Sequence, residues 1–108
     1  MSDELVVLVT APGIDDARRI SMELVSHRLA ACVNIIPAVQ SIYTWNEKIE
    51  ESEEALLIVK TTTARYAELE ARVKALHQYT TPEVIALKIE RGLAPYLKWL
   101  RNSTSPPG

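Results

Sequence analysis

Three side chains of this sequence could together bind a metal ion: His77, Glu83 and Cys32. Cys32 is the one cysteine, and its soft thiolate suits Cu(I) or zinc, although a free cysteine at a strand start is also a typical small buried side chain. His77 lies near the expected end of a helix, where an imidazolium would also face the negative end of the helix dipole. Tyr79 and Glu83 follow in a break between helix and strand, where binding sites are often built.

These residues do not complete a metal site by themselves. A tetrahedral zinc site has four protein ligands, or three and a water, and the sequence contains no CxxC or HxxxH pair. His77 with Glu83 is an incomplete first shell, so Cys32 or residues of a neighbouring subunit would have to complete it. Such a shell would hold copper or another divalent cation only weakly.

A run of glutamates is the second candidate, for a hard cation. Strand alternation places two of the four on one face and two on the other, so they do not converge. Solvated charges that protect a strand edge from aggregation are the favoured interpretation. The four residues are Glu50, Glu51, Glu53 and Glu54.

Enzymatic activity is not expected. An acylphosphatase-like hydrolase would need a cation and free amides in the loop after the first strand, but the loop from Thr10 to Gly13 has no cation and Pro12 lacks an N–H. The sequence also contains no GxSxG, P-loop or HExxH motif.

A long β-hairpin from Ala31 to Thr62 would organise the chain around these residues. Two runs rich in Ile, Val, Tyr, Trp and Thr are separated by Asn46-Glu47-Lys48. From Val33 the odd positions are apolar up to Trp45 except Ser41, which predicts a strand with one buried face.

The predicted hairpin is longer than the body of the domain. Each arm of roughly 14 residues would span about 45 Å, whereas a compact chain of this size is about 34 Å across. The overhang carries apolar side chains, Tyr43 and Trp45 among them, that would aggregate unless covered. We therefore expect a partner chain, with these aromatic residues as interface anchors.

The remaining elements surround this hairpin. Leu5 to Thr10 predicts a strand buried on both faces, Ile14 to Leu29 and Tyr66 to Leu76 carry helical apolar spacing, Glu83 to Glu90 predicts a strand, and Pro95 opens a short helix. The order βαββαβ with a short C-terminal helix predicts an α+β, ferredoxin-like sandwich. Residues 1–102 form the single expected domain and residues 103–108 a disordered tail.

Composition excludes several classes of protein. The net charge of −2 disfavours binding to nucleic acid or to a membrane surface, and no apolar run reaches the length of a membrane span. The acidic start, Met-Ser-Asp-Glu, is unlike a secretory signal. A single cysteine fits the reducing cytosol, so a cytoplasmic location is expected.

Several ordered motifs make the sequence resemble the CutA divalent-cation tolerance (CutA1-like) family. They cover Leu5 to Arg101 and read Thr10 to Pro12, Arg28 to Pro37, Ser41 to Trp45, Lys60 to Thr62, His77 with Tyr79, Pro82-Glu83, and Tyr96 to Leu100. The resemblance implies a ferredoxin-like subunit of a cytosolic homotrimer whose hairpins extend one another's sheets, and a role in tolerance of metal ions, copper above all, without a settled enzymatic activity.

The sequence departs from the family pattern at several positions. Gln78 stands where members often have Pro, Glu47 where they have a turn Gly, and Lys88 where they have Pro. Val9 and Leu76 replace a Cys and a His found in members implicated in copper binding, so of that site only His77 transfers.

The alternative function is that of a small-molecule-sensing or scaffold trimer, similar to PII-type signalling proteins in fold and assembly. It predicts a cleft between subunits lined by Tyr79, Lys60 and arginine side chains, next to the interface residues Tyr43 and Trp45.

Overall fold

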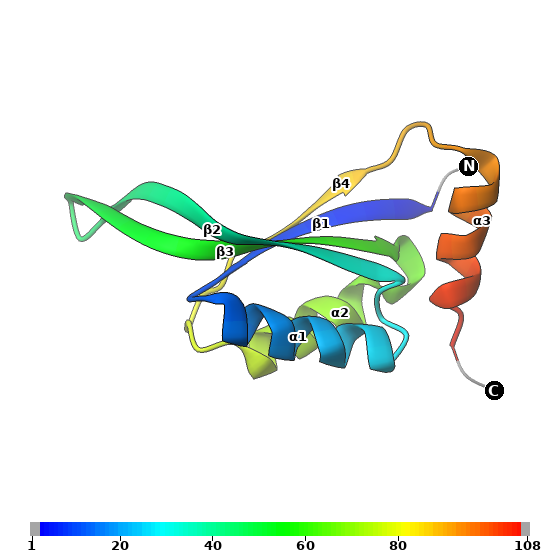
Figure 1. Cartoon of the computed structure of the whole chain (residues 1–108), viewed down its shortest axis with the longest axis horizontal. Coiled ribbons are helices and arrows are strands. Elements are labelled where there is room, and N and C mark those ends of the chain that lie inside the picture. The colour runs from blue at the N-terminus through cyan, green and yellow to red at the C-terminus, as the bar shows by residue number, and fades with distance from the viewer. Residues whose placement is uncertain (1–2, 107–108) are drawn as a thin grey trace.

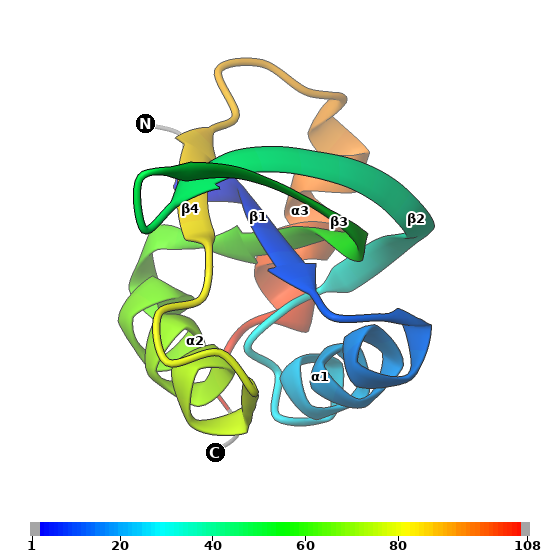
Figure 2. The same cartoon turned by 90° about the vertical axis from the view of Figure 1, so that its left-hand side faces the viewer.

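The computed structural model describes residues 3–106 as one antiparallel sheet with helices α1 and α2 on a single face and α3 at one end (Figures 1 and 2). The strands lie in the order β2-β3-β1-β4. No helix in this described part is long and apolar enough to cross a membrane. The elements are β1 Glu4–Ala11, α1 Ile14–Ser26, β2 Cys32–Trp45, β3 Lys48–Thr62, α2 Thr63–Leu76, β4 Val84–Lys88 and α3 Ala94–Ser103. The predicted α+β, ferredoxin-like fold is confirmed.

The core lies between the sheet and the two helices. Alternate residues of the central strands face it, because successive side chains of a strand point to opposite faces. The other face of β1 carries no helix, and Val6 and Leu8 are partly exposed there, so the prediction that β1 is buried on both faces is wrong for the single chain. Residues that meet in the core include Val7, Val9, Ile20, Leu24, Leu57, Val59, Leu69 and Val73.

The C-terminal end of α1 differs from the prediction. The helix stops at Ser26, and Arg28 adopts a left-handed conformation with φ 59° that reverses the chain. Leu29 therefore reaches the core from beyond the helix. Within the helix, Val25 is 43% exposed where the periodicity predicted a buried side chain.

The expected disordered tail is ordered over its first residues. Ser103 ends α3, and Thr104 is 2% exposed, with its hydroxyl donating to the carbonyl of Leu100 at 3.0 Å. Arg28 donates through Nε to the carbonyl of Ser105 at 2.7 Å, which ties this segment to the end of α1. The prediction is wrong for residues 103–105, while residues 107–108 lie outside the described part of the chain.

A β-bulge divides the hairpin into two halves. Ile36 lies opposite Leu56 and Val39 opposite Glu54, so Pro37 and Ala38 together face the single residue Ala55. Proline has no N–H for the sheet ladder and is tolerated at such a bulge. Because of the extra residue, odd-numbered residues of β2 change to the other face of the sheet from Val39 onward.

This reversal corrects the predicted single buried face of β2. Before the bulge, Val33 and Ile35 pair with residues of β3 that face the core. After it, Ser41 and Tyr43 pair with Ser52 and Glu50, on the face of β3 that carries Glu54 and Leu56 and not on the core face. The distal aromatic residues therefore lie on the sheet face opposite the helices.

The distal half of the hairpin extends beyond the helices (Figure 1). The molecule measures 45 × 27 × 22 Å, and its long axis runs along the hairpin. Apolar side chains on this extension are open to solvent in the single chain, with Trp45 63% and Ile49 82% exposed. The predicted overhang is present in the single chain.

We predict that Glu47→Gly stabilises the folded chain. The turn has two central residues, Asn46 and Glu47, with φ 51° and φ 63°, as in a type I′ hairpin turn that favours Asn-Gly. Relief of left-handed strain at Glu47, less the greater entropy of glycine in the unfolded chain, should raise the free energy of unfolding by about 0.5–1 kcal/mol. Glu47→Ala removes the same charge but keeps the strain, so denaturant midpoints should rank Gly above Ala; equal midpoints would contradict the prediction.

Candidate functional site

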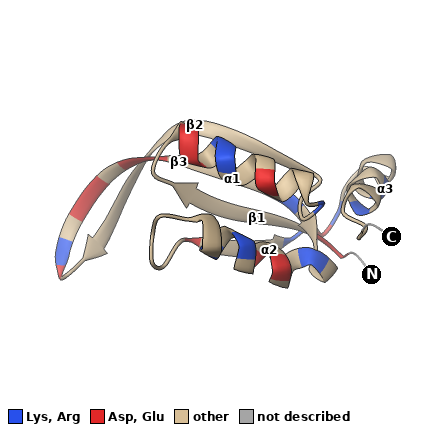
Figure 3. Ribbon diagram, turned by 90° about the horizontal axis from the view of Figure 1, so that it is seen from below, with Lys and Arg blue, Asp and Glu red and all other residues tan. Residues whose placement is uncertain are grey.

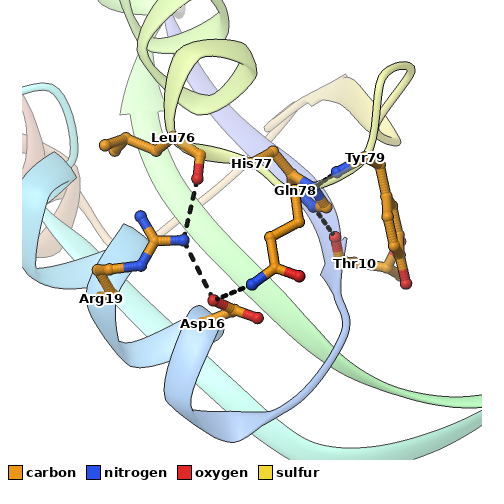
Figure 4. Close-up of polar contacts among 7 residues, drawn as sticks. All are labelled: Thr10, Asp16, Arg19, Leu76, His77, Gln78 and Tyr79. Carbon is orange, nitrogen blue, oxygen red and sulfur yellow. Dashed lines mark hydrogen bonds and ion pairs between the residues drawn. The ribbon is translucent and has the colours of Figure 1, made fainter.

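His77 joins the end of α2 to the end of β1. Its backbone N–H donates to the carbonyl of Val73, and its ring is 9% exposed. The Tyr79 N–H donates to Nδ1 at 3.0 Å, so Nδ1 carries no proton and Nε2–H donates to the carbonyl of Thr10 at 2.7 Å (Figure 4). Both ring nitrogens are therefore occupied by backbone groups, and neither has a free lone pair for a metal ion.

The same loop is also fastened to α1. Arg19 donates to the carbonyl of Leu76 at 2.9 Å and to Asp16 at 3.1 Å, and Gln78 Nε2 donates to the same Asp16 oxygen at 3.2 Å (Figure 4). Gln78 occupies the position at which the family pattern often has proline, and its side chain adds a tie that proline lacks. The loop between α2 and β4 is thus held rigidly against both α1 and β1.

Cys32 lies far from His77 along the sheet. Cys32 pairs with Lys60, whereas Thr10, which His77 contacts, pairs with Leu56, four residues away along β3. This separation is about 13 Å along the strand direction, before the distance across the strands is added. The predicted grouping of Cys32 with His77 and Glu83 does not occur within one chain, and residues 3–106 contain no cluster of three or more His, Cys, Asp or Glu that could hold a metal ion.

Lys60 lies directly opposite Cys32 in the β2–β3 pair. Its ammonium group contacts the Asn34 side-chain oxygen, and the Cys32 thiol lies 3.8 Å from the same atom. Tyr79 belongs to the opposite end of the sheet, beside Thr10. Within one chain, Lys60 and Tyr79, which were predicted to line a cleft between subunits, lie at opposite ends of the sheet.

A pocket of about 650 Å³ lies where the hairpin leaves the body of the domain. We call it the hairpin-base pocket. The bulge brings the distal residues of β2 to it, the loop after α2 forms another wall, and Thr10 and Glu54 come from the central strands. Its lining consists of Thr10, Ser41, Ile42, Tyr43, Trp45, Glu54, Tyr79, Thr80, Thr81 and Glu83.

Glu54 is the buried charged group of this pocket. Its side chain is 8% exposed, and its Oε2 accepts a hydrogen bond from the Tyr79 hydroxyl at 2.9 Å. Burial of the phenol, together with the hydrogen bond and charge of Glu54, raises the pKa of Tyr79 to about 12. Tyr79 is therefore a neutral hydrogen-bond donor at physiological pH.

The predicted site residues divide between two places. Glu83, Tyr79, Tyr43 and Trp45 line the hairpin-base pocket, and Cys32 and Lys60 lie elsewhere. Glu54, which the sequence suggested was a solvated edge charge, is the residue that was missed. Pro37 within a strand was the available signal, because a proline there indicates a bulge and hence a change of face.

Comparisons with known proteins identify relatives over nearly the whole chain. The family model described as CutA1 divalent ion tolerance protein matches residues 5–103. The "Divalent-cation tolerance protein CutA" of Thermus thermophilus is 54% identical over 94% of this chain and 98% of that protein. "Protein CutA 1, chloroplastic" of Oryza sativa is 46% identical, covering 93% of this chain but 56% of the relative, so this chain spans about half of that longer protein.

Solved structures agree with this assignment. The structure titled "Divalent cation tolerance protein (Cut A1)" from Thermus thermophilus superposes with a TM-score of 0.93 at 53% identity, covering 94% of this chain and 99% of that one. The CutA structure from Archaeoglobus fulgidus, titled periplasmic, gives a TM-score of 0.92 at 41% identity over 94% of this chain and 99% of that one. The family description refers to tolerance of divalent ions and not to a reaction. The chain belongs to the CutA1 divalent ion tolerance protein family.

Proposed function

We propose that this chain is a non-enzymatic, cytosolic homotrimeric protein of divalent metal ion tolerance that binds such ions, copper included, weakly. Membership of the CutA1 family and the names of its relatives support the role in tolerance. Cys32, a free thiol and the one cysteine of the chain, supports a reducing compartment.

The observation that carries metal binding is that Glu54 and Glu83 line one pocket together with Thr10, Thr80 and Thr81. Carboxylate and hydroxyl oxygens bind divalent cations, but two carboxylates form an incomplete first shell. Weak binding follows from this small ligand set. His77 would join the shell only if the loop after α2 released it, and Cys32 only if it came from a neighbouring subunit.

The trimer is supported by the surface that a single chain leaves open. The distal hairpin exposes Ile42, Trp45 and Ile49, and β4 exposes Ile85 and Leu87 on the sheet face without helices. Several large apolar side chains left exposed on one chain are typical of an interface. Neighbouring subunits that pair with the hairpin would cover both its apolar side chains and its open strand edge.

Native mass spectrometry of the reduced protein, titrated with copper and zinc, tests the proposal. We expect a trimer that takes up a whole number of ions per subunit. Glu83→Gln should weaken uptake at least tenfold, since loss of even an outer-shell partner of a metal ligand costs about 10–100-fold. Glu51→Gln is the matched control, because it removes an exposed carboxylate of the same region that does not line the pocket.

The outcomes separate assembly from metal binding. Uptake that is equal in both variants, or no specific uptake, would sink the proposed site, whereas a monomer would sink the proposed assembly. Cys32→Ser tests completion by a neighbouring subunit, because its uptake should fall only if the thiol is a ligand across the interface.

A small-molecule-sensing or scaffold trimer, similar to PII-type proteins in fold and assembly, is the second candidate function. The observation that favours it is the hairpin-base pocket, since about 650 Å³ lies within the range of ligand sites. A ligand that occupies this pocket should raise the melting temperature of the assembled protein without added metal.

A further inference from the structure

Tyr79 is fixed through both its backbone and its hydroxyl. Its backbone N–H donates to Nδ1 of His77 at 3.0 Å, and its hydroxyl donates to Oε2 of Glu54 at 2.9 Å. The His77 ring, itself bonded to the carbonyl of Thr10, lies beside the Tyr79 ring with 4.6 Å between the ring centroids (Figure 4). Burial raises the pKa of Tyr79 to about 12, so the hydroxyl is a donor and not a phenolate ligand. The phenol is therefore held in one direction, towards Glu54.

The two carboxylate oxygens of Glu54 differ in their surroundings. Oε2 accepts the hydrogen bond of Tyr79, whereas Oε1 accepts none from the described residues 3–106. Each carboxylate oxygen has about two lone pairs, and this hydrogen bond uses one of those on Oε2. The side chain is 8% exposed, so the surrounding residues leave the carboxylate little room to turn and exchange its oxygens. A bound cation is therefore expected at Oε1.

The number of oxygens that Glu54 offers affects the choice of ion. Calcium takes roughly six to eight oxygen ligands and often binds a glutamate through both oxygens, whereas zinc commonly takes about four ligands. The carboxylates that line the hairpin-base pocket are those of Glu54 and Glu83. If each binds through one oxygen, few further ligands complete the shell of zinc, but the shell of calcium stays far from complete.

Charge alone does not select between these two ions. Figure 3 shows the acidic run along distal β3, where five glutamates and one lysine lie between residues 46 and 54. Such a field attracts every divalent cation alike. Selectivity must therefore come from the way in which the carboxylates are oriented.

The orientation of Glu54 does not depend on the open end of the hairpin. Glu54 pairs with Val39, directly after the bulge, and its hydrogen bond comes from the loop after α2 of the same chain. A neighbouring subunit that covers Trp45 and Ile49 at the far end of the hairpin leaves this contact in place. The arrangement is thus compatible with the proposed trimer.

We propose that Tyr79 is a positioning residue, which orients Glu54 to bind a divalent ion through Oε1 alone and so favours zinc over calcium. The inference rests on the proposed metal-binding function and assigns to Tyr79 a part in its selectivity. His77 contributes through Tyr79, because its Nδ1 fixes the Tyr79 backbone. His77 takes this part as an acceptor of a backbone N–H and not as a metal ligand.

Isothermal titration calorimetry with zinc, on the assembled and reduced protein, tests the proposal without calcium and with millimolar calcium, the range of weak calcium sites in proteins. The native chain should bind zinc with an affinity that calcium leaves unchanged. Tyr79→Phe removes only the hydroxyl and should weaken zinc binding by about tenfold or more, the cost of losing an outer-shell partner. Because the released Oε2 lets Glu54 bind calcium through both oxygens, calcium should then compete with zinc.

Tyr66→Phe is the matched control. The Tyr66 hydroxyl also donates to a glutamate, Glu70, at 2.9 Å, but neither residue lines the hairpin-base pocket. This variant should bind zinc as the native chain does, with or without calcium. In Tyr79→Phe, hydrogen exchange at the amide of residue 79 should stay slow, because the bond to His77 uses the backbone N–H.

The possible results separate this inference from the function on which it rests. If the native chain binds zinc and Tyr79→Phe leaves that affinity unchanged or raises it, the positioning role is refuted while the metal site stands. A loss of zinc affinity without competition by calcium would also refute it, because Tyr79 would then support the loop without selecting the ion. If the native chain binds no zinc, the metal-binding function fails and this inference fails with it.

Discussion

Trp45→Glu is expected to convert the assembled protein into monomers or aggregates. The Trp45 side chain is 63% exposed at the end of the overhanging hairpin, and the proposed trimer buries it against a neighbouring subunit. Truncating a central aromatic anchor costs an interface about 2 kcal/mol or more, and a charge there adds the penalty of desolvation. Because closed symmetry places the substitution at every interface of the proposed trimer, the free-energy cost is incurred once for each interface.

Light scattering coupled to size exclusion measures this result, with Met22→Glu as the matched control. Met22 lies on α1 and is 67% exposed, so the control introduces the same charge at a similarly open apolar residue away from the hairpin. We expect the control to keep the mass of the native protein. An intact trimer from Trp45→Glu would show that the interface lies elsewhere and that the overhang remains open.

His77→Ala is expected to lower the free energy of unfolding by about 3 kcal/mol. The substitution leaves a cavity, a Thr10 carbonyl without its donor and a Tyr79 N–H without its acceptor. The effect should appear in the metal-free protein, because it arises from the two backbone bonds and not from ligation. Hydrogen exchange at the Tyr79 amide should accelerate by the factor that corresponds to this loss of free energy.

His27→Ala is the matched control for this prediction. His27 is the other histidine, its side chain is 49% exposed, and its ion pair with Glu23 spans 3.6 Å. Loss of such a surface pair changes stability by about 0.5 kcal/mol or less. If the metal-free His77→Ala protein were as stable as His27→Ala, the role of His77 as a structural link would be contradicted. The interpretation of His77 as a metal ligand would then be favoured again.

The topology could be predicted because it depends on local periodicity. The apolar spacing in α1 and α2 and the two strand-like runs of the hairpin are each visible within short windows. The position of the bulge was not visible in this way. Apolar residues occupy the odd positions on both sides of Pro37, so the pattern reads as continuous although the paired strand shows that its face changes.

The candidate site was predictable only in part for a similar reason. Tyr79 and Glu83 were found because they are close in sequence to His77. Glu54 was missed because its burial depends on Tyr79, 25 residues away, which donates to it. His77 was interpreted as a ligand because no sequence pattern shows that Thr10, 67 residues away, occupies its second nitrogen.

The bulge at Pro37 and Ala38 also separates two kinds of constraint along one strand. On its core side, Val33 and Ile35 of β2 pack against the interior, where a change of a single methylene group affects stability. On the distal side, the same strand presents its odd residues to the hairpin-base pocket and to the proposed interface with a neighbouring subunit. Substitutions there can change what the protein recognises while the interior of the subunit stays intact, so related chains could diverge in ligand and partner on an unchanged fold.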